Sequence, residues 1–274
     1  MIDRELIKRA LAEDLQGGED ITSVATVSGD EKVVADFVSR KAGVIAGIEM
    51  AKAVLEEVGL TDIDVLIHDG ESVQAGQVLM TVRGDTRAIL LAERTALNFL
   101  GHLSGIATLT RRWVDAISGT RCQIRDTRKT TPGMRLLEKY AVRMGGGTNH
   151  RISLSDAALI KDNHIAAAGG VAAAFSKVRE KFPSSEIEIE VDTLDQLREV
   201  LPLKPDLVLL DNMSPAQCAE AVAIVAGATK LEASGGISME NARAYAETGV
   251  DYLAIGALTH SAPVFDIGLD LRAE

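Results

Sequence analysis

Apolar and polar residues follow two different patterns along the chain, and the change falls near residue 120. Residues 2–14 and 49–58 place apolar side chains at helical spacing, which predicts amphipathic helices. Short runs of β-forming residues lie within residues 33–48 and 63–82, where Gly-containing turns separate them. The first part of the chain is therefore predicted to combine strands and helices without regular alternation.

Two helices are predicted between this part and residue 120. Residues 86–100 form a strong helical pattern, in which Arg94 is flanked by apolar turns. A second helix is predicted over residues 106–117, because a Leu-Ser-Gly sequence interrupts the pattern just before it.

Beyond residue 120, short apolar strands alternate with helical segments. The predicted strands are residues 122–126, 157–161, 186–191, 206–211, 230–234 and 251–256. The predicted helices are residues 134–143, 169–181, 193–201, 215–226 and 239–248. This order indicates a parallel sheet with right-handed crossovers, either an open sheet or a closed barrel. About 140 residues are available, whereas a complete eight-unit barrel needs roughly 250, so an incomplete α/β barrel of about six parallel strands fits better.

Polar or small residues follow each predicted strand, at the end where parallel α/β folds bind ligands. Charged residues inside such apolar strands would be costly if they were buried without partners, so we expect a site at this edge. The residues are Thr127, Arg128, Lys129 and Thr130; Lys161, Asp162, Asn163 and His164; Glu190, with Glu188 on the same face; Asp211 and Asn212; Ser234, Gly235 and Gly236; and Gly256, Ala257 and Leu258.

The last two strand ends suggest a phosphate site. Glycines let backbone N–H groups approach an anion closely, and Ser238 is the expected N-cap of the helix that follows Ser234-Gly235-Gly236. Gly256 and Ala257 would complete this cradle, as the loops after the final two strands often do in barrels. A plain tight turn is the alternative.

Glu190 and Asp211 follow successive strands and fit a Mg²⁺ site that also uses substrate phosphates. A general acid and base pair, or partners for Lys161, are alternatives. His150 follows three glycines and could donate a proton or a hydrogen bond, although a structural role is equally open.

Charge is unevenly distributed over the 274 residues, whose net charge is −11. The segment from Arg121 to Lys161 has nine basic and three acidic residues, a balance of +6, while the rest carries −17. We interpret this basic segment as a pocket for a small polyanion, with a solvated basic face as the alternative. An acidic chain with 3% aromatic residues is a poor nucleic-acid binder.

The remaining composition points to the cytoplasm. Two cysteines do not form a disulfide framework or a zinc spacing, so reduced thiols are expected. The charged start lacks the apolar region of a signal peptide, and no apolar run of about 18 residues predicts a membrane span.

Several long motifs then resemble one family. DTRKTTPGMRLLEKYAVRMGGGTNHRISLSDAALIKDNH, AERTALNFLGHLSGIATLT, IEIEVDTLDQL, LLDNMSP, LEASGGIS and VDYLAIGALTHSAP are similar to quinolinate phosphoribosyltransferases, also called carboxylating nicotinate-nucleotide pyrophosphorylases. The resemblance covers nearly the whole chain. It implies Mg²⁺-dependent conversion of quinolinate and phosphoribosyl pyrophosphate to nicotinate mononucleotide, pyrophosphate and CO₂ in NAD biosynthesis.

The resemblance also implies an architecture and roles for particular residues. It implies an N-terminal α/β sandwich (residues 1–105, with the tail 264–274) and an incomplete α/β barrel (residues 106–263). It implies a homodimer, or a higher oligomer, in which Arg94 enters the neighbouring site. Quinolinate would contact Arg94, Thr127, Arg128, Lys129, His150, Arg151 and Lys161. The phosphoribosyl group would contact Glu190, Asp211, Ser234, Gly235, Gly236, Gly256 and Ala257, with Mg²⁺ near Glu190 and Asp211. The catalytic residues would be Lys129, Lys161, Glu190 and Asp211.

Three residues depart from the family pattern and leave substrate preference open: Arg125, Met144 and Ser153. The alternatives are a same-fold paralogue of the molybdenum-transport-associated type with another acceptor, a nicotinate phosphoribosyltransferase, and a non-catalytic sugar-phosphate sensor. The intact basic segment and the presence of Lys161, Glu190 and Asp211 favour the carboxylating enzyme.

Overall fold

A computed structural model describes residues 2–272, which form two compact units. The first unit contains residues 2–111, 136–146 and 261–272, and the second contains residues 112–135 and 147–260. The predicted division into domains after residue 105 stays a prediction. Within residues 2–272, no helix combines the length and apolar character needed to cross a membrane.

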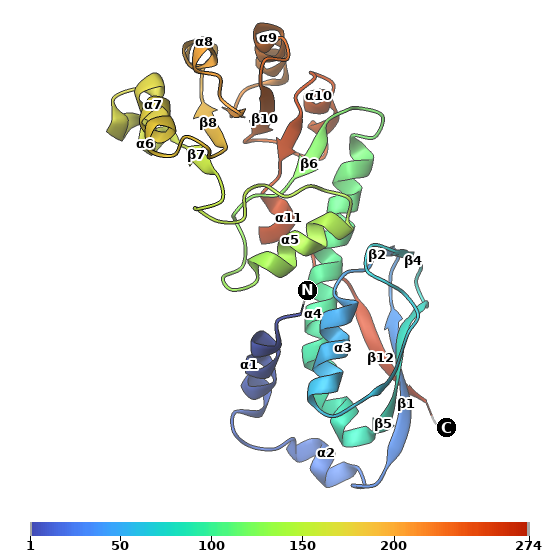
Figure 1. The fold of residues 1–274 in the computed structure, drawn as a ribbon. Coiled ribbons are helices and arrows are strands. Elements are labelled where there is room, and N and C mark those ends of the chain that lie inside the picture. Colours follow the sequence, from blue (N-terminus) through green and yellow to red (C-terminus); the bar gives the residue numbers. More distant parts are fainter. Residues whose placement is uncertain (1, 273–274) are drawn as a thin grey trace. The chain divides into compact units, whose positions relative to one another are not determined.

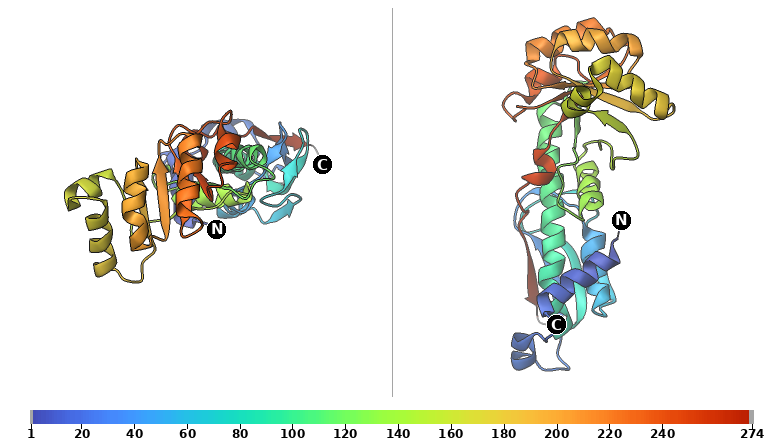
Figure 2. Two further views of the ribbon diagram at one scale, coloured as in Figure 1. Left: turned by 90° about the horizontal axis from the view of Figure 1, so that it is seen from above. Right: turned by 90° about the vertical axis from the view of Figure 1, so that its left-hand side faces the viewer.

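The first unit is built on an antiparallel sheet in the order β12-β1-β5-β3 (Figure 1). Its central strands β1 and β5 are the two apolar runs predicted from the sequence. Helices α1 and α3 pack on each other beside this sheet (Figure 2). The elements are α1 Arg4–Leu15, α2 Ile21–Thr26, β1 Lys32–Ser39, β2 Gly43–Val44, α3 Ile48–Glu57, β3 Asp62–Val65, β4 Ser72–Val73, β5 Val78–Asp85, α5 Arg135–Met144 and β12 Ile267–Arg272.

One continuous helix, α4 (Thr86–Ala116), replaces the two helices predicted between residues 86 and 117. The predicted break was wrong because Ser104 and Gly105 serve packing and do not end the helix. The Ser104 hydroxyl is buried and both accepts from the N–H of Ala46 and donates to its carbonyl, at 3.0 and 3.1 Å. A Cβ on Gly105 would lie 2.2 Å from the Pro263 carbonyl oxygen, so only glycine allows this close approach.

The second unit contains a parallel six-stranded sheet in the order β6-β11-β10-β9-β8-β7, which confirms the predicted fold class. Each predicted strand is present, and its predicted ends differ from the observed ends by no more than one or two residues. The strands are β6 Gln123–Arg125, β7 Ala158–Ile160, β8 Ile187–Val191, β9 Leu207–Asp211, β10 Lys230–Ser234 and β11 Tyr252–Ala254. The helices are α6 Asp162–Ala168, α7 Val171–Lys181, α8 Leu194–Val200, the 3₁₀ turn η1 Leu201–Leu203, α9 Pro215–Val225, α10 Ala242–Ala246 and α11 Ala257–His260.

The helix after β10 differs from its prediction. It begins at Ala242 with Asn241 as the N-cap residue, so the assignment of Ser238 as N-cap was wrong. Ser238 instead opens a turn, in which its N–H donates to the Asn241 side chain at 2.8 Å. Because α10 has only five residues and starts well after Gly236, its dipole does not serve the predicted phosphate cradle.

Candidate active site

Side chains at the carboxyl ends of the parallel strands surround one cavity of about 330 Å³ in the second unit, here called the strand-end cavity. This volume falls in the range of about 300–1,000 Å³ that is typical of small-molecule sites. Nine residues that the sequence placed in the site line it: Thr127, Arg128, Lys129, His150, Arg151, Lys161, Glu190, Asp211 and Ser234.

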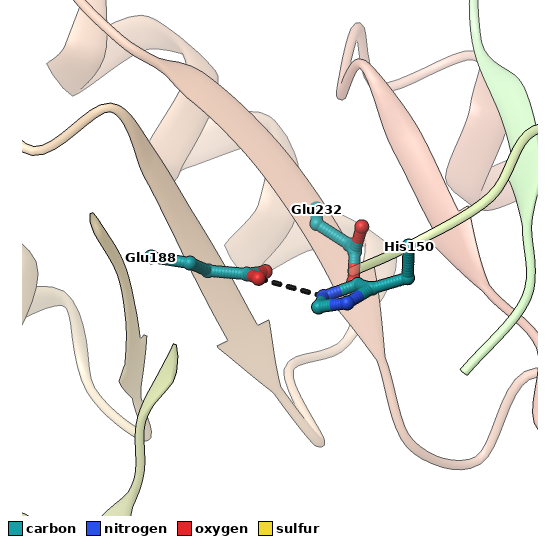
Figure 3. Close-up of side chains that lie close together, drawn as sticks. All are labelled: His150, Glu188 and Glu232. Carbon is teal, nitrogen blue, oxygen red and sulfur yellow. Dashed lines mark ion pairs between the residues drawn. The ribbon is translucent and has the colours of Figure 1, made fainter. Parts of the chain in front are cut away.

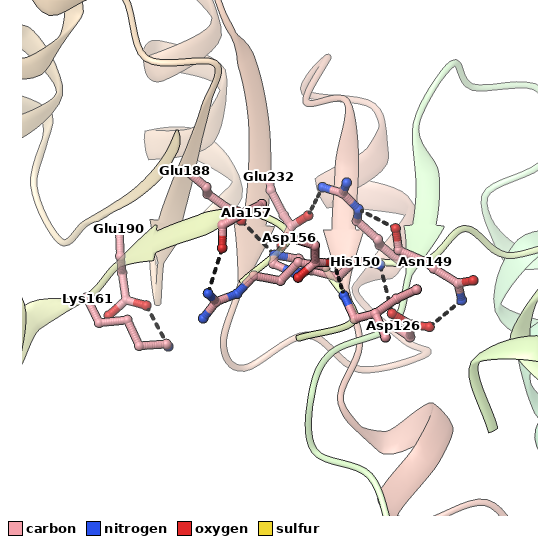
Figure 4. Close-up of polar contacts among 12 residues, drawn as sticks. Asp126, Asn149, His150, Asp156, Ala157, Lys161, Glu188, Glu190 and Glu232 are labelled. Carbon is pink, nitrogen blue, oxygen red and sulfur yellow. Dashed lines mark hydrogen bonds and ion pairs between the residues drawn. The ribbon is translucent and has the colours of Figure 1, made fainter. Parts of the chain in front are cut away.

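Asp126 organises the basic side of this cavity. It is fully buried at the end of β6, and its carboxylate accepts from the backbone N–H of His150 at 2.8 Å and from the Asn149 side chain at 2.5 Å (Figure 4). Thr148 adds a backbone bridge to Arg125 of β6. These contacts fix residues 148–150 beside the sheet edge, so His150 and Arg151 reach the cavity from a rigid segment.

Arg128 and Arg151 are the clearest sign of an anionic ligand. The Nε atom of each guanidinium is buried and has no hydrogen-bond partner within residues 2–272. Burial lowers the pKa of Arg151, and the neighbouring Arg128 charge lowers it further. Two half-buried guanidinium groups that repel each other and have unused donors favour a bound anion, because carboxylates accept from this planar fork in pairs.

Acidic side chains, those of Glu190 and Asp211, also line the cavity. Lys161 Nζ donates to Glu190 Oε2 at 3.0 Å, a pairing that the sequence left open as an alternative to the Mg²⁺ site (Figure 4). Burial raises the pKa of Asp211, and the nearby charges of Glu190 and Asp192 raise it further. Carboxylates held this close together are stabilised by a cation, and their oxygen donors are those that Mg²⁺ prefers.

The predicted phosphate cradle is brought to the cavity only in part. Ser234 lines the cavity, whereas Gly235, Gly236, Gly256 and Ala257 are not among the described residues that do so. Gly235 has a positive φ of 85°, and a Cβ there would lie 2.1 Å from Asn212 Oδ1. Glycine is therefore required at this turn by backbone conformation and by the close approach of Asn212.

A group of three buried side chains and the half-buried Arg125 lies against the cavity, and most of it was missed from sequence. We call Arg125, His150, Glu188 and Glu232 the buried His–Glu cluster, and Figure 3 shows how His150, Glu188 and Glu232 lie together. Glu188 is anticipated only as a face-sharing neighbour of Glu190, Arg125 only as a departure from the family pattern, and Glu232 not at all. The signal that could have found Glu232 is a single carboxylate between the two apolar residues of strand β10, Leu231 and Ala233.

Arg94 belongs to the first unit and is not one of the residues that line the strand-end cavity. Its side chain is exposed on α4. Its predicted role in a neighbouring subunit's site stays a prediction.

A second, larger cavity of about 590 Å³ runs along β7 and is lined mainly by small and apolar residues. It contains few polar groups that converge on one point. The strand-end cavity is the better candidate despite its smaller volume, because it collects charged groups with perturbed pKa values.

Two family models together match most of the chain. The model of the C-terminal domain of quinolinate phosphoribosyl transferase matches residues 106–270, and the model of the N-terminal domain matches residues 20–104. The chain belongs to the quinolinate phosphoribosyltransferase family.

Individual relatives agree over nearly their whole length. A nicotinate-nucleotide pyrophosphorylase [carboxylating] from Mycobacterium leprae is 54% identical, with 98% of this chain and 96% of the relative covered. A probable enzyme of the same name from Bacillus subtilis is 40% identical, with 98% and 93% covered. The crystal structure of nicotinate-nucleotide pyrophosphorylase from Ehrlichia chaffeensis has a TM-score of 0.94 at 41% identity, with 98% of each chain covered.

Proposed function

We propose that this family member transfers the phosphoribosyl group of phosphoribosyl pyrophosphate to quinolinate, and releases pyrophosphate and CO₂ to leave nicotinate mononucleotide for NAD biosynthesis. The observation that carries the proposal is the pair of cavity-lining guanidinium groups, Arg128 and Arg151, with buried and unused Nε donors. The names of the relatives at 54% and 40% identity support the same reaction.

The acceptor is recognised by charge. Quinolinate has two adjacent carboxylates, so it suits a cavity wall with Arg128, Lys129, His150 and Arg151 on one side. A monocarboxylate such as nicotinate would leave part of this positive charge without a partner. Unpaired buried donors cost binding free energy, so the cavity favours the dicarboxylate.

The phosphoribosyl donor would lie toward the acidic side. Glu190 and Asp211 face the part of the cavity where positive charge develops on the ribose as pyrophosphate leaves, as in other glycosyl transfers. Lys161, held at 3.0 Å by Glu190, can contact an anionic oxygen of either substrate.

Mg²⁺ fits the donor set of Glu190 and Asp211, directly or through the pyrophosphate, and would supply charge neutralisation of the leaving group. The raised pKa of Asp211 marks it as a carboxylate whose ionised form gains from a nearby cation. These two residues would hold the ion, and Lys161 would orient the donor beside it.

Decarboxylation follows from the position of the acceptor. Once the pyridine nitrogen carries the ribose, the ring is a pyridinium, and the C2–carboxylate bond can break with its electron pair left on C2. A proton then replaces CO₂ at that carbon. The chain needs to hold the ring in place and exclude competing water, and it needs no covalent nucleophile for this step.

The assembly and compartment are parts of the same proposal. We propose a homodimer, or a higher oligomer, in which Arg94 completes the quinolinate site of the neighbouring subunit. Its support is the exposed position of Arg94 on α4, with no ion-pair partner among residues 2–272. The cytoplasm fits the two cysteines, Cys122 and Cys218, which are buried and unpaired.

The test is a paired assay with purified protein, Mg²⁺ and phosphoribosyl pyrophosphate. One reaction contains quinolinate and the other contains nicotinate, and nicotinate mononucleotide is measured in both. Product from quinolinate alone supports the proposal. Product from nicotinate alone, or from neither acceptor in folded protein that binds phosphoribosyl pyrophosphate, contradicts it, and the second result favours a same-fold paralogue with another acceptor.

A further inference from the structure

The buried His–Glu cluster joins three strands of the sheet directly beneath the strand-end cavity. His150 Nε2 lies 2.6 Å from Glu188 Oε2 on β8 and 3.6 Å from Glu232 Oε1 on β10 (Figure 3). Arg125 on β6 donates to Glu232 Oε2 at 2.9 Å and stacks over the Tyr252 ring at 4.3 Å. His150 and Glu232 also line the cavity, so the cluster is in a position to act on a bound ligand.

Two groups in this cluster are not fully satisfied. Glu188 Oε1 and Glu232 Oε1 are buried without a hydrogen-bond partner within residues 2–272. A packing role alone does not account for two such carboxylates, because an unpaired buried acceptor costs stability. Sites that keep this cost are often functional.

A metal ion is a poor explanation for the cluster, although its donor atoms lie within 4.8 Å of one another. The 2.6 Å contact between His150 Nε2 and Glu188 Oε2 is that of an ion pair, and a metal ion bound between these two atoms would need them to lie farther apart. A cation is also already present, because the Arg125 guanidinium contacts Glu232. The contacts are those of groups that share a proton.

Charge balance indicates where the proton lies. The charged groups around His150 are Glu188 from β8, Glu232 from β10 with its partner Arg125 from β6, and Asp126, which accepts from the His150 backbone N–H at 2.8 Å. Arg128 and Arg151 line the same cavity as His150. With a neutral imidazole, the Glu232 carboxylate would be balanced by Arg125, and the Glu188 carboxylate by the more distant charges of Arg125, Arg151 and Lys161. Burial raises the pKa of Glu188 and the pKa of Glu232 to about 7, so the two carboxyl groups and the His150 ring can share protons near neutral pH.

We propose that Glu232 is a positioning residue that, together with Glu188, keeps His150 protonated and fixes its ring at the base of the cavity, so that His150 presents a positive charge to a carboxylate of the acceptor. This inference rests on the proposed function for the identity of that carboxylate. Glu232 does not itself contact the acceptor in this account. Arg125 partly opposes the effect of Glu232 on His150, because the positive charge of Arg125 repels the imidazolium.

The first test needs no variant and no turnover. Nitrogen-15 NMR of the full-length protein follows the imidazole signals of His150 as the pH is changed. The variants His150→Tyr and His150→Gln serve only to assign these signals. We expect His150 to titrate above the value of about 6.5 that is ordinary for histidine. A neutral His150 ring at pH 6.5 overturns the inference, whatever the enzyme assay shows.

Two variants then test Glu232 and Arg125 with opposite expected signs. Glu232→Gln removes the negative charge that Glu232 carries once it is ionised, so the His150 ring should lose its proton at lower pH. Arg125→Met removes a positive charge, so the titration moves to higher pH. The second variant keeps the test decisive if the first does not fold. Shifts in the same direction, or no shift in either variant, contradict the assigned role.

Kinetics connect the cluster to the acceptor. In the parent, kcat/KM for quinolinate should fall as pH rises through the His150 titration, because an anion loses its partner. In Glu232→Gln this fall should begin at lower pH, and KM for quinolinate at pH 7.5 should rise about tenfold, with KM for phosphoribosyl pyrophosphate within about twofold of the parent. Equal effects on both substrates would indicate a merely structural role.

Glu138 provides a matched control. It is fully buried and lies 2.9 Å from His102 Nε2, but both residues belong to the first unit, away from the cavity lining. Glu138→Gln should leave the pH profile for quinolinate unchanged. If the parent protein converts quinolinate but its His150 ring is neutral, this inference is refuted and the proposed function is not. If the parent protein forms no product from quinolinate, the proposed function is refuted, and the NMR titration of His150 still stands as a separate result.

Discussion

Replacing Arg151 by lysine separates recognition by charge from recognition by a planar guanidinium. The Nε of Arg151 is buried without a partner in residues 2–272, while its Nη1 donates to the Ala157 carbonyl at 2.9 Å. Arg151→Lys keeps one positive charge and removes the Nε donor. If Nε donates to a quinolinate carboxylate, the loss is one hydrogen bond to a charged group, about 1.5–3 kcal/mol. This converts to a rise of about 10- to 150-fold in KM for quinolinate.

The assay measures initial rates in two series: quinolinate is varied at saturating phosphoribosyl pyrophosphate, and then phosphoribosyl pyrophosphate is varied at saturating quinolinate. Only KM for quinolinate should change strongly. Arg179→Lys is the control, since Arg179 also donates to backbone carbonyls, those of Pro183 and Ser185 at 3.0 Å, but does not line the strand-end cavity. The two variants should lower the melting temperature by similar amounts. Unchanged quinolinate kinetics in Arg151→Lys would refute bidentate recognition by this residue.

Three further predictions concern the metal region, the assembly and pH. Asp211→Asn should raise the Mg²⁺ concentration for half-maximal activity and KM for phosphoribosyl pyrophosphate about tenfold or more, while an unchanged metal titration would speak against its role. Mixing inactive Arg94→Ala and Lys161→Ala proteins should restore part of the activity, because a mixed dimer contains one intact site; proven subunit exchange without recovery would argue against a shared site. The pKa of Glu232 is about 7 in the folded protein and about 4.3 in the unfolded chain. Protonated Glu232 therefore contributes its full stabilisation of the folded state below pH 4.3, and this contribution is lost as the pH rises toward 7. Urea unfolding at pH 5 and pH 8 should therefore show a smaller loss for Glu232→Gln than for the parent, and equal losses would contradict the assigned environment.

Much of the second unit could be predicted from the sequence, because its signals are local. Apolar runs such as residues 206–211 are typical of buried parallel strands, and β9 covers Leu207–Asp211. The rule that ligands bind at the carboxyl ends of such strands brought Lys161, Glu190 and Asp211 together, and all three line one cavity.

The failures arise where distant contacts override local pattern. The local pattern of Ser104 and Gly105 predicts a helix break. In the structure, the Ser104 hydroxyl instead accepts a hydrogen bond from the N–H of Ala46, and the missing side chain of Gly105 leaves room for the Pro263 carbonyl. Ala46 and Pro263 are both far away along the chain. Glu232 was missed because a lone carboxylate in a strand gives no sign of its partners. Arg125 lies 107 residues away in sequence, and only the sheet order brings the two side chains together.

The most direct measurement uses quinolinate carrying a carbon label in one carboxyl group at a time, with phosphoribosyl pyrophosphate and Mg²⁺. The account predicts that label at the C2 carboxyl appears as CO₂ in equal amount to nicotinate mononucleotide and pyrophosphate, and that label at the C3 carboxyl stays in the nucleotide. Phosphoribosyl pyrophosphate consumed without release of the C2 label, or no nucleotide formed from quinolinate by folded protein, would contradict it.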